Sequence, residues 1–90
     1  MLTRKEANVS AVDVVIIGGC GHVGLPLGLA FADRGLNVVL YDLNPDAVDA
    51  VNDGRLPFAE PDALEILHTV QAAGRLHAST DPATVRDAVS

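Results

Sequence analysis

Residues Gly19 to Gly24 have the spacing G-x-G-x-x-G, and an acidic residue, Asp42, follows 18 residues after Gly24. Three glycines at this spacing allow the backbone of a strand-to-helix turn to approach a phosphate closely. The helix that follows points its free N–H groups and the positive end of its dipole at the anion. A carboxylate about 20 residues further on can accept hydrogen bonds from ribose hydroxyls. The combination predicts a dinucleotide site.

Each glycine has a separate expected role in such a site. Gly19 permits the tight turn, Gly21 leaves room for a pyrophosphate beside the backbone, and Gly24 lets the helix press against the strand. The charge of Asp42 repels a 2′-phosphate, and Leu43 beside it supplies no cation, so the sequence favours NAD over NADP. The expected cofactor-binding residues are Gly19, Cys20, Gly21, His22, Val23, Gly24, Asp42 and Asn44.

Several of these residues also have simpler interpretations. The glycines could form an ordinary strand-to-helix turn, and Asp42 could be a strand-end residue or a helix cap. Cys20 could be a redox-sensing thiol near a helix start, or a small residue packed under the turn. His22 could approach the pyrophosphate or the nicotinamide, or simply pack at the helix start. Asn44 could contact the ribose, although capping the next helix is its expected task.

The sequence provides no catalytic residue and no metal site. Cys20 is the only cysteine, which excludes an intrachain disulfide and a multi-cysteine zinc site. His68 and His77 have no partners at metal-ligand spacing.

Alternating strands and helices are expected to position the glycine turn. Strands are predicted within 12–18, 37–42 and 75–80, and helices within 22–35, 44–54, 61–74 and 81–90. Asn44 and either Thr80 or Asp81 are the expected caps of the second and fourth helices. Leu64, Leu67 and Val70 are expected to face inward on the third helix.

This order predicts an α/β fold: a Rossmann-like parallel sheet with flanking helices, incomplete, with three strands in the order 3-2-1. Four β-branched residues at 14–17 are typical of a strand covered on both faces. Without a fourth strand, however, this first strand presents an unpaired apolar edge. We therefore expect a polar leader at 1–11 and, at 12–90, the first part of a larger domain.

Composition narrows the expected partners. The chain has 90 residues, 49% of them hydrophobic, and a formal net charge of −6, which argues against nucleic acid or an anionic membrane as a partner. No apolar run approaches the roughly 20 residues of a membrane span, and the start lacks a signal-peptide core. A cytoplasmic protein is expected.

Four further motifs carry a resemblance to a known family. They are the helix start G-x-V-G-L-P-L, the D-x-N-P after the second strand, the loop N-x-G…P-F-x-E-P and the late S-T-D-P. With these motifs, residues 12–90 resemble the N-terminal segment of UDP-sugar 6-dehydrogenases, which act on UDP-glucose, UDP-N-acetylmannosamine and their relatives. Ala47 departs from the family because many members have lysine there, and "PDAL" replaces the common P-G-L.

The resemblance implies a two-domain, homo-oligomeric oxidoreductase of polysaccharide biosynthesis. Such enzymes use NAD twice to oxidise the C6 alcohol of a UDP-sugar to a carboxylate, through a catalytic cysteine thioester. That cysteine and the substrate domain would lie beyond residue 90, so the 90-residue chain alone is expected to be inactive. Two alternatives are a non-catalytic NAD-binding sensor or partner module, and the first unit of a 3-hydroxyacyl or 2-hydroxyacid dehydrogenase.

Overall fold

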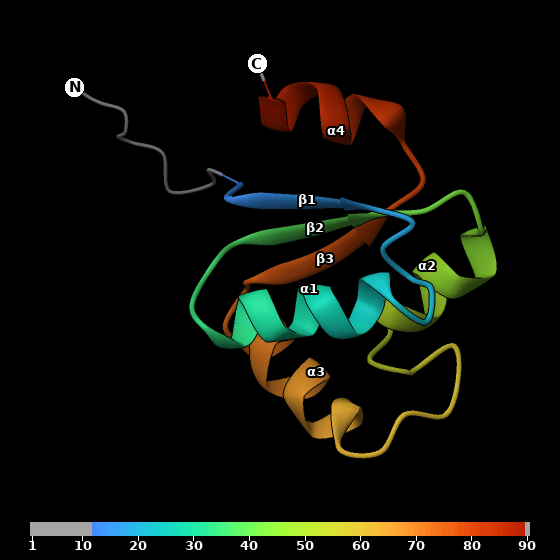
Figure 1. The fold of residues 1–90 in the computed structure, drawn as a ribbon. Helices are drawn as coiled ribbons and strands as arrows, with labels where there is room; N and C mark the ends of the chain where they lie inside the picture. The colour runs from blue at the N-terminus through green and yellow to red at the C-terminus, as the bar shows by residue number, and fades with distance from the viewer. Residues whose placement is uncertain (1–11, 90) are drawn as a thin grey trace.

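The computed structural model describes residues 12–89, and the predicted leader at 1–11 lies outside them. Strands and helices alternate along the chain, except that two consecutive helices lie between the second strand and the third (Figure 1). The elements are β1 (Val14–Ile17), α1 (Gly24–Asp33), β2 (Val38–Tyr41), α2 (Pro45–Asn52), α3 (Ala63–Ala72), β3 (Leu76–Ser79) and α4 (Pro82–Val89).

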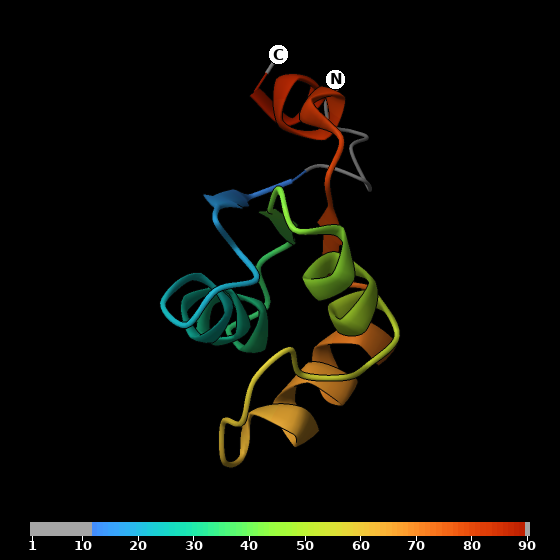
Figure 2. The same ribbon diagram turned by 90° about the vertical axis from the view of Figure 1, so that its right-hand side faces the viewer.

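The three strands form one parallel sheet in the order β1-β2-β3. In its register, Val38 of β2 lies between Val14 of β1 and Leu76 of β3. Helices α1, α2 and α3 lie on one face, and α4 crosses the other (Figures 1 and 2). This arrangement confirms the predicted α/β class, the parallel pairing and the order 3-2-1, which is the same order read from the opposite edge.

The polar caps and the turn residues predicted from the sequence define most of the helix ends. The Asn44 side chain accepts hydrogen bonds from two backbone N–H groups in the first turn of α2, at 3.0 and 3.3 Å. Asp81 rather than Thr80 caps α4, since its carboxylate accepts from the N–H of Ala83 at 2.9 Å. Gly35, just after α1, has a φ of +95°, as expected of a residue that ends a helix.

Helix α3 differs from its prediction at its start. It begins at Ala63 rather than near Pro61, because Asp62 has a φ of +70° and cannot belong to the helix. Leu67 and Val70 are buried as predicted, but Leu64 is 44% exposed, so its predicted inward position was wrong. The inward stripe instead continues from Val70 through Leu67 to Ala63, at helical spacing.

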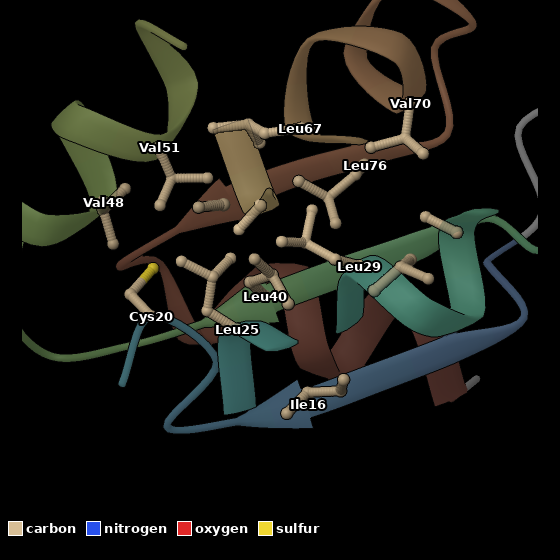
Figure 3. Packing of buried hydrophobic residues seen from close by; sticks show 14 of the residues in the cluster. Ile16, Cys20, Leu25, Leu29, Leu40, Val48, Val51, Leu67, Val70 and Leu76 are labelled. Carbon is tan, nitrogen blue, oxygen red and sulfur yellow. The ribbon is translucent and has the colours of Figure 1, made fainter. Parts of the chain in front are cut away.

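The core lies between the sheet and the helices of one face (Figure 3). Leu40 of β2 is fully buried, and α1 crosses it closely because Gly28 has no side chain. A Cβ at Gly28 would lie 2.5 Å from Leu40 Cδ2. The face of α1 that carries Gly24, Gly28 and Ala32 is therefore its contact with the sheet, and it brings the start of α1 close to the strand ends.

The two edges of the sheet differ. At β1 only Ile16 is buried and Ile17 is 67% exposed, so the prediction of full cover on both faces was wrong; within the described residues β1 pairs with β2 alone. At β3 the Asn52 amide pairs with Ala78 as a strand would, donating to its carbonyl at 2.8 Å and accepting from its N–H at 2.9 Å. The unpaired apolar edge thus lies at β1, as predicted.

No helix in residues 12–89 is long and apolar enough to cross a bilayer.

Candidate dinucleotide site

The glycine turn lies at the carboxyl ends of the strands, where β1 leads into α1 (Figure 1). The N–H groups of Gly18 and Gly19 both donate to the carbonyl of Tyr41, at 2.8 and 3.0 Å, and that of Gly21 donates to Gly18 at 3.2 Å. Gly18, directly before the motif, is left-handed with a φ of +71°, whereas Gly19 does not have a positive φ. The turn is therefore held against the end of β2, beside Asp42.

Gly19 and Gly24 are required by close packing. A Cβ at Gly19 would lie 2.6 Å from Leu40 Cβ and 2.9 Å from the Ile16 carbonyl oxygen. A Cβ at Gly24 would overlap the carbonyl oxygen of Gly18 and lie 2.8 Å from the Cα of Gly19. The first helical turn therefore presses on the glycine turn itself, which is the contact that the motif predicts for its third glycine.

Gly21 is different because open space surrounds it. A Cβ there would meet only the Gly18 carbonyl oxygen, at 3.4 Å, and Gly21 lines a cavity. Nearby, α1 has no side-chain cap and no acidic residue in its first turn, and Val23 at the N-cap is 80% exposed. An uncapped helix start beside an open glycine has the donors and the space that an anion needs.

Asp42 also lines this cavity and bonds to the turn. Its Oδ2 accepts a hydrogen bond from the N–H of Cys20, and its Oδ1 accepts one from the N–H of Asn44, both at 3.0 Å. Each carboxylate oxygen has two lone pairs, so both keep capacity for a further donor. Asp42 is therefore both a structural link between β2 and the turn and a free acceptor at the cavity.

The cavity has a volume of about 270 Å³ and brings together residues from three connections. Five of the predicted site residues line it: Cys20, Gly21, His22, Asp42 and Asn44. Gly19 and Gly24 lie buried behind them, and Val23 lies at the exposed helix start.

Three further lining residues, Ala47, Pro57 and Phe58, were not predicted as site residues. Phe58 stacks on His22, with ring centroids 4.1 Å apart and planes inclined by 22°. The sequence signal for Pro57 and Phe58 was the P-F-x-E-P loop, which the resemblance used as a family mark but not as part of the site. None of the lining residues is a lysine or arginine, so the cavity offers no cation to a 2′-phosphate.

Cys20 is the small residue packed under the turn. It is 3% exposed, and its sulfur points toward Val48 of α2 (Figure 3). Burial, reinforced by the negative charge of Asp42, raises the pKa of the thiol from 9.0 to about 11. A thiol held protonated in this way is a poor nucleophile, which disfavours the redox-sensor interpretation.

This burial predicts slow alkylation of Cys20. At pH 8 we expect iodoacetamide to modify the native protein far more slowly than the same protein in urea, because the thiolate is scarce and covered. The native rate should rise with pH and level off only near pH 11, where the thiol is half ionised, and mass spectrometry can follow it. Equal native and unfolded rates at pH 8 would contradict the buried, protonated thiol.

Among the remaining candidates, His68 has a structural role. Its Nε2 donates to the carbonyl of Gly54 at 2.8 Å and so joins α3 to the end of α2. Residues 12–89 contain no group of three His, Cys, Asp or Glu side chains that could hold a metal ion.

A parallel sheet with a glycine turn at its carboxyl edge and an acid ending the second strand defines a dinucleotide-binding domain of the Rossmann class. A family model for the NAD-binding domain of the UDP-glucose/GDP-mannose dehydrogenase family matches residues 12–89. The chain therefore belongs to the UDP-glucose/GDP-mannose dehydrogenase family, and NAD is the cofactor of the matched domain.

Individual relatives agree with this assignment. UDP-N-acetyl-D-mannosamine dehydrogenase of Escherichia coli strain K12 is 42% identical over 64 residues, covering 71% of this chain and 15% of that protein. NDP-N-acetyl-D-galactosaminuronic acid dehydrogenase of Ralstonia nicotianae is 34% identical over 76 residues, covering 80% of this chain and 18% of that protein. The chain thus spans less than a fifth of the length of these relatives.

Solved structures extend the similarity to the fold. GDP-mannose dehydrogenase from Pseudomonas aeruginosa matches with a TM-score of 0.72 and 31% identity, over 76% of this chain and 15% of that one. UDP-glucose dehydrogenase from Pyrobaculum islandicum matches with a TM-score of 0.70 and 32% identity, over 82% and 17%. Such matches confirm the Rossmann-like architecture.

Proposed function

We propose that this chain is the cofactor-binding start of an NAD-dependent enzyme that oxidises the C6 alcohol of a UDP-sugar to a carboxylate. The observation that carries the proposal is the shared cavity. Its lining includes both the open backbone of Gly21 and the carboxylate of Asp42, which accepts a hydrogen bond from the turn at 3.0 Å. A diphosphate and a ribose need these two kinds of group at neighbouring positions.

The residues present fit NAD. Gly21 and the uncapped start of α1 would hold the pyrophosphate, and Asp42 would accept hydrogen bonds from the adenosine ribose hydroxyls. Asn44 lines the cavity while capping α2, so a ribose contact adds to its structural role. When bound, NAD supplies a nicotinamide ring that accepts hydride from the substrate carbon. The residues described here bind and orient, and none is assigned a catalytic role.

Experiments can distinguish the dehydrogenase from the alternative of a non-catalytic NAD-binding module. We expect the purified 90-residue chain to bind NAD in a calorimetric titration but to turn over no UDP-sugar, because the family's cysteine and substrate residues have no counterpart in it. The intact mass of the natural product then distinguishes the two. A species of several hundred residues supports the dehydrogenase, whereas a stable protein of 9.3 kDa supports a sensor or partner module.

A titration without heat or saturation would contradict the proposed site, and turnover of UDP-sugar by the 90-residue chain would contradict its predicted inactivity. A cytoplasmic location and a homo-oligomeric enzyme remain predictions of composition and resemblance. The hydroxyacyl and hydroxyacid dehydrogenase alternative loses support, because the matched family model is that of nucleotide-sugar dehydrogenases.

A further inference from the structure

The ring stack between His22 and Phe58 joins the glycine turn to a distant loop. His22 follows the second glycine of the motif, while Phe58 belongs to the connection between α2 and α3. The two rings are nearly parallel, 4.1 Å apart, and both line the cavity that Gly21 and Asp42 also line. A contact between these two connections therefore lies at the proposed NAD site.

The N–H groups of the first half of the turn are engaged, whereas those of the second half are not. From Gly18 to Gly21 they donate to the carbonyls of Tyr41 and Gly18 and to the Asp42 carboxylate. Beyond Gly21, the carbonyl of Val23 accepts from Leu27 at 3.3 Å, but His22 and Val23 are exposed, their N–H groups make no backbone hydrogen bond within residues 12–89, and no side chain caps α1. The stack thus acts on the part of the turn whose N–H groups a diphosphate would use.

Phe58 is itself anchored to the core. It is half-buried and packs against the core cluster. Two hydrogen bonds join α3 to the end of α2 and to the start of the same connection. The Gln71 amide donates to the carbonyl of Val51 in α2 at 2.6 Å, and His68 donates to that of Gly54 in the connection. Because the Phe58 ring is anchored to the core, it can restrain the exposed His22 ring that stacks on it.

We propose that Phe58 is a positioning residue for NAD: through the stack on His22 it holds the start of α1 in the orientation that receives the diphosphate. This inference rests on the proposed NAD site and adds to it a residue from outside the glycine motif. Pre-ordering a binding loop raises affinity because less freedom is lost when the ligand binds.

The test compares variants of the 90-residue chain that lose or keep the stack. Phe58→Leu keeps an apolar side chain but removes the aromatic face, whereas Phe58→Tyr keeps the face and is the matched control. An aromatic pair of this kind corresponds to a change in affinity of about 2- to 10-fold. We expect a loss in this range in the NAD affinity of Phe58→Leu, and affinity within about twofold of the parent for Phe58→Tyr.

Two further measurements separate positioning from general damage. Adenosine, which lacks the diphosphate, should bind Phe58→Leu and the parent equally in an NMR titration. His22→Ala removes an exposed ring and leaves the core intact, so it should reproduce the loss of NAD affinity even if Phe58→Leu folds poorly. In the double variant the two losses should not add, because each removes the same stack.

The inference is overturned if Phe58→Leu and His22→Ala bind NAD as the parent does, or if their losses add in full. It is also overturned if adenosine affinity falls in parallel with NAD affinity. These results leave the proposed site standing as long as the parent binds NAD and Asp42→Ala weakens that binding. A parent chain that fails to bind NAD overturns both.

Discussion

Replacing Gly24 with alanine is expected to destabilise the protein although the added methyl group is small. The new Cβ would overlap the Gly18 carbonyl oxygen and crowd the Cα of Gly19, and all of these are backbone atoms that cannot rotate away. Overpacking of this kind typically costs about 1–3 kcal/mol and occasionally more. The higher helix propensity of alanine returns at most about 1 kcal/mol. We expect a net loss of about 1–2 kcal/mol in the free energy of unfolding, measured by urea denaturation.

Gly21→Ala is the matched control, because the same methyl group is added within the same motif. Its Cβ would meet a single atom, at 3.4 Å, and otherwise lie in open space. We expect the unfolding free energy to change by less than about 0.5 kcal/mol, as for other substitutions away from packed groups. NAD affinity should nevertheless fall, since the methyl group lies in the cavity. Equal stability of the two variants would contradict the close packing at Gly24.

Local sequence signals predicted most of the fold. Sequence reasoning identifies features that depend on near neighbours in the chain. These are the apolar runs of the three strands, the Asn44 cap, and the glycines that follow α1 and α2. The errors arose where distant contacts decide. Leu64 is exposed because α3 packs inward through Ala63, Leu67 and Val70 instead, and Ile17 is exposed because no described element covers that end of β1.

The same contrast between local signals and distant contacts applies to the candidate site. The glycine spacing and the acid at Asp42 predicted that these residues lie near one another, because the motif is local and the ends of parallel strands share one edge. Phe58 could not be predicted, since its place beside His22 depends on how the connection between α2 and α3 returns to the turn.

Asp42→Ala is expected to have the largest effect on cofactor binding. Removal of a charge-assisted acceptor for the ribose hydroxyls should weaken NAD binding by about 1–3 kcal/mol, roughly 5- to 150-fold. Discrimination against NADP should fall as well, because the carboxylate no longer repels a 2′-phosphate. Isothermal titration with both cofactors measures the two effects. Asp49→Ala is the control, since it removes an equal charge from an exposed position of α2 that does not line the cavity.

The structure adds a second consequence that the motif alone does not predict. The carboxylate of Asp42 also accepts the N–H groups of Cys20 and Asn44, so its loss leaves two backbone donors without their acceptor. We expect about 1–2 kcal/mol lower stability, mainly from the partly buried Cys20 amide. Titrations therefore belong at a temperature where thermal denaturation shows the variant fully folded. Lower stability with unchanged NAD affinity would make Asp42 a purely structural link and remove it from the site. We expect losses of both stability and NAD affinity, because the same carboxylate fixes the turn and lines the proposed NAD site.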